Sequence, residues 1–147
     1  MATDNLTGHV MSGTIGRAPV SLVNTVDTAV DNKAQNDVDQ LFDVFPGDRV
    51  LAVDAKVETA EGGTLTFDVG DGSDVDGYID GANGNSTGWN TNVLTATAST
   101  GATPTITMTG YNAGKIYTAT DTIDVKWLNA ADAAKVRFRV TIVRAGE

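Results

Sequence analysis

The acidic, glycine-rich segment DGSDVDG, residues 71–77, is the part of this 147-residue chain whose residue types could bind a metal. An EF-hand loop binds Ca²⁺ through oxygen ligands at positions 1, 3 and 5 and a carboxylate at position 12, with glycine at position 6. With Gly77 at position 6, Gly72 falls at position 1 and Asn83 at position 12. Position 1 then has no side chain and position 12 has no carboxylate, so the spacing excludes an EF-hand.

A looser calcium site remains an alternative for this loop, because calcium accepts irregular cages of carboxylate and carbonyl oxygens. Its candidate ligands are Asp71, Asp74 and Asp76. The other interpretation is a hydrated loop, in which glycine supplies positive φ angles and aspartate caps its own backbone. We favour the hydrated loop, and we expect no metal and no cofactor.

Residues that could perform catalysis are sparse. There is no cysteine, and the one histidine, His9, lies in a polar segment that does not predict the packed surroundings of a catalytic triad. Aspartates are abundant enough for a pair of glycosidase carboxylates, but no pattern singles out an acid in an apolar pocket. The sequence therefore predicts no catalytic residues and a protein that is not an enzyme.

Trp89 is the remaining candidate for binding. It lies among asparagines and glycines in the polar segment 81–92, which we expect to be a long loop. An exposed indole there could stack on a sugar ring or on a partner's side chain. Alternatively, it folds back as a plug over one end of the domain. Trp127 instead alternates with Ile123 and Val125, which predicts a place in the core.

The elements that must position these residues are strands. In segment 45–81, alternating apolar residues (Leu51, Val53, Ala55 and Val57) predict a strand with one face in a core and one in water. Gly62 and Gly63 then turn the chain into a second run, Leu65, Phe67 and Val69. The preceding Phe45-Pro46-Gly47-Asp48 has the sequence of a type II turn.

The same pattern recurs along the chain and predicts an all-β fold. Eight to ten short strands are expected, the clearest over 136–143, and residues 128–135 are the only helix-like segment. This is typical of a single-domain antiparallel β-sandwich, either jelly-roll-like or immunoglobulin-like, since alternation does not determine strand order. We expect an extended N-terminal arm over 1–20 and the sandwich over 21–147.

The net charge of −9 makes nucleic acid an unfavourable partner, because binding to phosphates depends on lysine and arginine. No apolar run approaches the length of a membrane span and no secretory signal is visible, so we expect no membrane partner. Arg137 and Arg139 share one face of the last predicted strand. That face is either simply solvated, which we favour, or a contact for an acidic partner.

Three segments together resemble the small head proteins of tailed bacteriophages, some of which are capsid decoration or cement proteins. They are LFDVFPGDRVLAVDAKVETA, TLTFDVGDGSDVDGYIDG and IDVKWLNAADAAKVRFRVTIV, within residues 38–145. The resemblance implies a β-sandwich on the outer surface of the virion, bound to the major capsid protein. It also implies a homo-oligomer, with a trimer as one possibility, made in the host cytoplasm.

We expect the arm to bind the capsid, through the apolar residues Leu6, Val10, Met11 and Ile15, together with one edge of the sandwich. A segment that orders on docking widens an interface that a small domain limits. Two other functions remain open: a carbohydrate-binding module that uses Trp89, and a subunit of a phage tail or fibre.

Overall fold

The computed structural model describes residues 18–91, 95–97, 105–107, 110–111 and 114–145. These residues form strands and no helix. The strands are β1 (Val20–Asp27), β2 (Val38–Val44), β3 (Arg49–Thr59), β4 (Thr66–Asp71), β5 (Ile79–Asn83), β6 (Gly88–Thr91), β7 (Thr95–Thr97), β8 (Thr105–Thr107), β9 (Lys115–Ile116), β10 (Asp121–Trp127) and β11 (Lys135–Val143).

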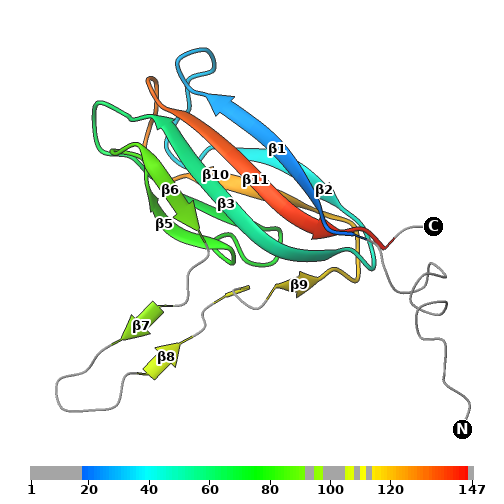
Figure 1. Cartoon of the computed structure of the whole chain (residues 1–147). Coiled ribbons are helices and arrows are strands. Elements are labelled where there is room, and N and C mark those ends of the chain that lie inside the picture. Colours follow the sequence, from blue (N-terminus) through cyan, green and yellow to red (C-terminus); the bar gives the residue numbers. More distant parts are fainter. Residues whose placement is uncertain (1–17, 92–94, 98–104, 108–109, 112–113, 146–147) are drawn as a thin grey trace, which may run out of the picture.

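The strands form two stacked sheets, and β7 and β8 form a separate hairpin that projects from them (Figure 1). The first sheet has the order β1-β11-β3-β6, with β9 also paired to β3, and the second has the order β2-β10-β4-β5. Every pairing is antiparallel. The first strand thus pairs with the last and the second with the last but one. The predicted antiparallel β-sandwich is confirmed.

Alternating apolar side chains fill the space between the sheets. In β11, Val136, Phe138, Val140 and Ile142 are buried, as predicted. In β3 the predicted pattern fails at its start, where Val50 is buried and Leu51 only partly so. Ala52 pairs with Thr141 while Val50 pairs with Ile142, which leaves Leu51 in a bulge. The extra residue turns Leu51 away from the core.

Three aromatic rings from both sheets meet at the centre of the core. Phe138 of the first sheet lies 5.8 Å from Phe67 and 6.4 Å from Trp127, both of the second sheet. The centroids of Phe67 and Trp127 are 5.5 Å apart. Trp127 is fully buried, and its indole Nε1 donates a hydrogen bond of 2.8 Å to Asp39. The prediction that Trp127 belongs to the core is confirmed, and its polar atom is satisfied.

Strand β4 differs from the predicted half-exposed strand. Asp71 is buried on the inward face with Phe67 and Val69. Asp68 and Gly70 are also buried, although they lie on the outward face. The acidic loop folds back over this face, so that a Cβ on Gly70 would lie 2.0 Å from the carbonyl oxygen of Asp74. Glycine is required there because the loop backbone occupies the space of a side chain.

The helix expected over 128–135 is wrong. Its backbone groups instead bond to distant segments: Ala131 exchanges hydrogen bonds of 2.8 and 3.0 Å with the backbone of Lys33. The carboxylate of Glu61 accepts hydrogen bonds from three successive N–H groups of this segment, and the Thr28 hydroxyl accepts one from Ala134 at 2.8 Å. These partners replace the i−4 carbonyls that a helix would supply.

The long loop expected over 81–92 is also wrong. The chain continues in β5 to Asn83 and re-enters the first sheet as β6, which contains Trp89. Positive φ angles at Gly81 (65°) and Gly88 (147°) allow the bends at these strands. Polar composition concealed two short edge strands.

Among the described residues, no helix is long and apolar enough to cross a membrane.

Candidate binding surface at the β9 end

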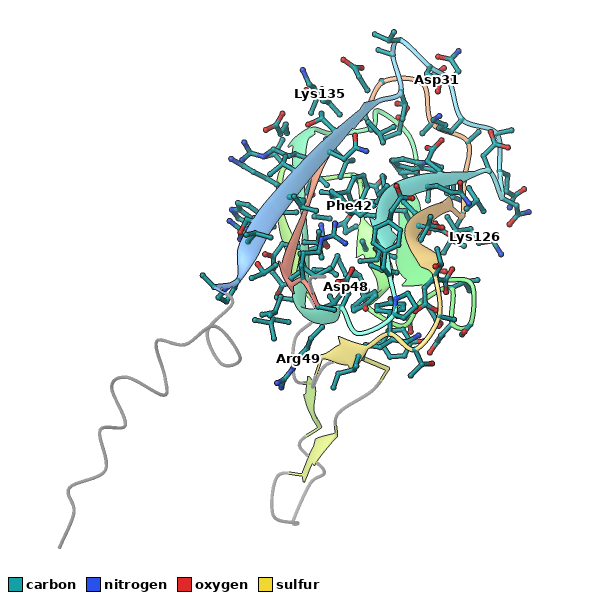
Figure 2. The ribbon with its side chains drawn as sticks, turned by 90° about the vertical axis from the view of Figure 1, so that its right-hand side faces the viewer. Asp31, Phe42, Asp48, Arg49, Lys126 and Lys135 are labelled. Carbon is teal, nitrogen blue, oxygen red and sulfur yellow. The ribbon has the colours of Figure 1, made fainter. Side chains whose placement is uncertain are left out.

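One end of the sandwich presents two exposed apolar side chains beside two arginines. Phe45 is 49% exposed and Ile116 is 61% exposed. Arg49 pairs with Ile116 in the β3–β9 ladder, and Arg144 follows β11. We refer to Phe45, Arg49, Ile116 and Arg144 as the β9 end. Figure 2 shows Asp48 and Arg49 here, with Asp31 and Lys135 at the opposite end.

The β9 end lies where two other segments leave the sandwich. Val20, the first residue of β1, pairs with Ile142, two residues before Arg144. The chain therefore enters β1 close to Arg144. The hairpin of β7 and β8 projects on the same side as β9 (Figure 1). Chain entry, hairpin and exposed apolar residues thus gather at one end.

A buried carboxylate, Asp48, holds the turn that carries Phe45. Gly47 has a φ of 89° and Asp48 N–H donates to the carbonyl of Phe45 at 3.0 Å, which confirms the type II turn. Asp48 accepts hydrogen bonds from Arg144 at 2.6 Å and from the N–H groups of Phe45 and Ala145, both at 3.0 Å. The Arg144 guanidinium lies 5.7 Å from the centroid of the Phe45 ring.

A second buried carboxylate, Asp71, holds the segment that carries Ile116. Tyr117 and Tyr111 donate their hydroxyl hydrogens to it at 2.8 and 3.1 Å, and Lys115 forms an ion pair with it. Tyr78 is hydrogen-bonded to Tyr117 at 2.8 Å. Both oxygens of Asp71 are engaged. Oδ2 accepts hydrogen bonds from Lys115 and Tyr117, and Oδ1 accepts them from Tyr111 and from the N–H groups of residues 73 and 74.

These contacts set the ionisation of the network. Burial of Asp71 opposes its charge, but hydrogen bonds from Lys115 and Tyr117 outweigh burial and lower its pKa below the usual value. The pKa of Asp48 is lowered in the same way, with burial opposed by backbone N–H donors and Arg144. Burial raises the pKa values of Tyr78 and Tyr117, which stay protonated donors. At neutral pH the two carboxylates are therefore charged and the two tyrosines keep their hydroxyl hydrogens, so the hydrogen bonds of both networks are maintained.

The Asp48 and Asp71 networks are joined by backbone hydrogen bonds. Gly47 N–H donates to the carbonyl of Tyr117 at 2.7 Å, and Tyr117 N–H donates to the carbonyl of Asp48 at 2.9 Å. Phe45 and Ile116 are therefore carried by one rigid unit. A pre-organised pair of apolar side chains loses little entropy when a partner covers it.

The candidate calcium ligands Asp71, Asp74 and Asp76 are arranged differently from a metal cage. Asp71 is turned inward to Lys115, whereas hydrogen bonding with Asp76 raises the pKa of Asp74. In the part of the chain that the structure describes, no group of three or more His, Cys, Asp or Glu side chains could hold a metal ion. The hydrated-loop interpretation is correct in that Asp71 caps its own loop. It is wrong in two respects: Asp71 is buried, and neither Gly72 nor Gly77 has a positive φ angle.

Trp89 lies on the outer face of the first sheet rather than over its end, so the plug interpretation is wrong. It is 49% exposed and pairs with Lys56 in the β3–β6 ladder. The Arg139 guanidinium and the Lys56 ammonium lie 5.0 and 5.6 Å from the indole. Arg139 is held in turn by Asp54 at 2.7 Å. Cations already occupy the vicinity of this ring.

The basic face predicted on the last strand is largely neutralised by the neighbouring strand. Arg137 lies 3.4 Å from Glu58, and Arg139 is paired with Asp54 as described above. Both acids belong to β3, which pairs with β11. This arrangement agrees with the solvated interpretation, because each guanidinium already has a carboxylate on its own sheet.

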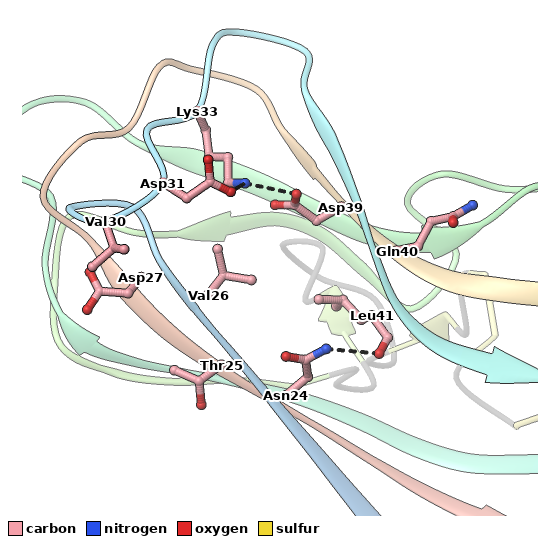
Figure 3. A pocket seen from close by; sticks show the side chains of 10 residues that line it. All are labelled: Asn24, Thr25, Val26, Asp27, Val30, Asp31, Lys33, Asp39, Gln40 and Leu41. Atoms are coloured by element: carbon pink, nitrogen blue, oxygen red, sulfur yellow. Dashed lines mark hydrogen bonds and ion pairs between the residues drawn. The ribbon is translucent and has the colours of Figure 1, made fainter.

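A groove of about 410 Å³ lies between β1 and β2 (Figure 3). Lys33 lies in it and is paired with Asp31 at 2.5 Å and Asp39 at 2.9 Å. Burial opposes the charge of Lys33, but hydrogen bonds to these acids raise its pKa, so it is no general base. Asn24 crosses the groove and donates to the carbonyl of Leu41 at 3.1 Å.

The predicted arm residues Leu6, Val10, Met11 and Ile15 lie outside the described residues, as does His9. Sequence reasoning did not single out Phe45 and Ile116 as surface residues. A signal existed for Phe45, since it precedes a Pro-Gly turn where an apolar strand has ended. For Ile116 there was none, because it reads as one member of an ordinary alternating strand.

Three solved structures share this fold. A chain in the acidic stable capsid structure of Helicobacter pylori bacteriophage KHP30 matches with a TM-score of 0.59 and 13% identity, over 88% of this chain and 90% of that chain. A chain in the capsid of Ralstonia phage GP4 matches with a TM-score of 0.57 and 13% identity, over 91% and 89%. A chain in the cyanophage Pam1 capsid asymmetric unit matches with a TM-score of 0.60 and 16% identity, over 97% of this chain and 98% of that chain.

At these identities the similarity establishes the fold. Because most of both chains is covered in each match, the matched chains have about the length of this one. No protein-family model matches the chain, and no curated protein matches it either.

Proposed function

We propose that this chain is a structural virion protein of a tailed bacteriophage that binds the outer surface of the capsid and stabilises the shell as a decoration or cement protein. The observation that carries the proposal is the match, over nearly the whole of both chains, to chains in three phage capsids. It agrees with the resemblance of the sequence to small phage head proteins.

The strand order supports the proposal. Nested pairing of the first strand with the last, and of the second with the last but one, gives two four-stranded layers when β9 is set aside. We interpret this order as a jelly roll rather than an immunoglobulin-like sandwich. Jelly rolls are frequent in viral capsid domains, although the fold alone does not determine function.

We assign attachment to the β9 end, together with the arm and the projecting hairpin. Phe45 and Ile116 supply exposed apolar area, Arg49 and Arg144 supply charge, and the Asp48 and Asp71 networks hold them rigid. An interface needs an apolar centre with a polar rim, and this end offers both. The partner is the major capsid protein.

The experiment uses capsids assembled without this chain and sedimented with the purified protein. We expect wild-type protein to co-sediment, and Ile116→Glu to lose binding at least tenfold while keeping its melting temperature. Val30→Glu, at the opposite end of the sandwich and also exposed, is the matched control and binds as wild type. Equal binding by Ile116→Glu would remove the β9 end from the proposal, and no binding by wild type would reject decoration.

The arm is tested separately by deleting residues 1–17, which precede the described sandwich. Loss of capsid binding by a truncated protein that remains folded supports the arm as part of the attachment site. Undiminished binding would remove Leu6, Val10, Met11 and Ile15 from it.

Carbohydrate binding through Trp89 is the second candidate, since the indole is half-exposed on the outer face of the first sheet. The nearby cations argue against it, because a stacking sugar must compete with Arg139 and Lys56 for the ring. Titration with a glycan library while following indole fluorescence decides the point, and we expect no saturable change. A tail or fibre location is the third candidate, which imaging of the virion distinguishes from the head.

A further inference from the structure

Strand β1 is a long sheet edge without the usual protection. Among the described residues, no strand pairs with the edge of β1 that faces away from β11. From Val20 to Val26 the strand carries no charge and no proline. Natural proteins guard such edges with charges, proline, bulges or short length, because unpaired N–H and C=O groups recruit another strand.

The other edges of the sandwich are guarded. β2 carries Asp39 and Asp43, β5 carries Asp80, and β6 is only four residues long. Among these four strands only β1 has a long uncharged stretch, Val20–Val26, because its one charged residue, Asp27, is the last residue of the strand. It also exposes apolar side chains on both of its faces: Val23 is 56% exposed on the outer face, and Val20 is 43% exposed on the core-facing side.

We propose that β1 is a self-association edge that pairs antiparallel with β1 of a second copy of this chain, forming a two-fold dimer with a continuous sheet. The occupant is a second copy because the edge is self-complementary. Side chains that face each other across an antiparallel ladder lie on the same sheet face. One residue must therefore pair with its own copy, and the two-fold axis lies between these two copies.

With the axis at Val23, each copy's Val20 faces Val26 of the other, and the two Val23 side chains meet. This register places no charge opposite another charge within Val20–Val26. It also covers Val26, which is only partly buried and lines the groove between β1 and β2. The pairing therefore satisfies the open backbone groups and buries the valines left exposed in one copy.

The dimer is expected to be weak, because one strand pair buries less than the ~1,000 Å² typical of stable interfaces. Sedimentation equilibrium of the full chain, from about 10 μM to about 1 mM, should show a rising average mass that fits a monomer–dimer equilibrium. Attachment of copies to one shell would strengthen it by raising the local concentration.

Two charge variants test the register. Val23→Glu and Val23→Lys each place like charges together on the two-fold axis, so each alone should remain monomeric. An equimolar mixture should recover association, because opposite charges then meet at the axis. Within one copy Val23 pairs with Arg139, so Val23→Glu is compatible with the fold, which circular dichroism and thermal melting verify.

Val38→Glu is the matched control, since Val38 is 53% exposed on the edge strand of the other sheet. It should associate as wild type does. A wild-type protein that stays monomeric at about 1 mM, association of Val23→Glu alone, or a mixture that stays monomeric would each overturn the proposal. The inference rests on the edge and not on the proposed function: Val23→Glu that binds capsids as a monomer would separate the two.

Discussion

Tyr117 donates its hydroxyl hydrogen to the buried carboxylate of Asp71 at 2.8 Å. The contact joins the acidic loop after β4 to the segment that carries the exposed Ile116. The acidic loop, whose composition made it a candidate calcium site, therefore fixes the position of the segment that carries Ile116. Its central carboxylate faces a lysine ammonium and two tyrosine hydroxyls where a metal cage would need further carboxylates.

Asp71→Asn should destabilise the fold by about 3 kcal/mol, because it leaves the largely buried charge of Lys115 without its counter-charge and weakens the hydrogen bonds that two tyrosine hydroxyls donate to Asp71. Urea unfolding measures the change. Asp80→Asn, an exposed acid of the same region, is the control and should stay within about 0.5 kcal/mol of wild type. A loss for Asp71→Asn no larger than that of the control would show that the network contributes little.

Acidification should remove this stabilisation. The pKa values of Asp71 and Asp48 are lowered in the folded state, so their contribution is fully present above the unfolded value of about 4 and is lost as the pH falls through the folded values. Thermal melts of wild type and Asp71→Asn should therefore differ most at neutral pH and converge at acid pH. A gap that stays constant down to about pH 2 would contradict this assignment.

Asp124→Asn should act in the opposite direction. Burial raises the pKa of this carboxyl, and its Oδ1 has no hydrogen-bond partner among the described residues. A raised folded pKa means that the ionised group opposes folding at neutral pH and that protonation relieves it. The variant should gain about 1 kcal/mol at pH 7, and the gain should vanish below about pH 4. Destabilisation at pH 7 would show that the charge has a partner in solution.

Gly70→Ala should cost at least about 2 kcal/mol, because the new Cβ would lie 2.0 Å from the Asp74 carbonyl oxygen and force the acidic loop off β4. Gly62→Ala is the matched control, since nothing lies within 4 Å of its Cβ position. Chemical denaturation compares the two. Equal stability of both variants would mean that the loop is not packed on β4.

Alternation within single strands was enough to predict which residues face the core. Burial that depends on partners far away in the sequence could not be predicted. Alternation in β10 and β11 identified the inward residues, because each strand has one face on the core. The burial of Asp71 could not be predicted, since its partners Lys115 and Tyr117 are 44 and 46 residues away. Trp89 was placed in a loop because glycines and asparagines at both ends of β6 conceal a short strand.

A reconstruction of the virion that encodes this chain tests the central claim most directly. We predict density for the β-sandwich on the outer surface of the head, with the β9 end facing the major capsid protein. Density for the sandwich in the tail, in a fibre or inside the shell, or its absence from the virion, would contradict the account.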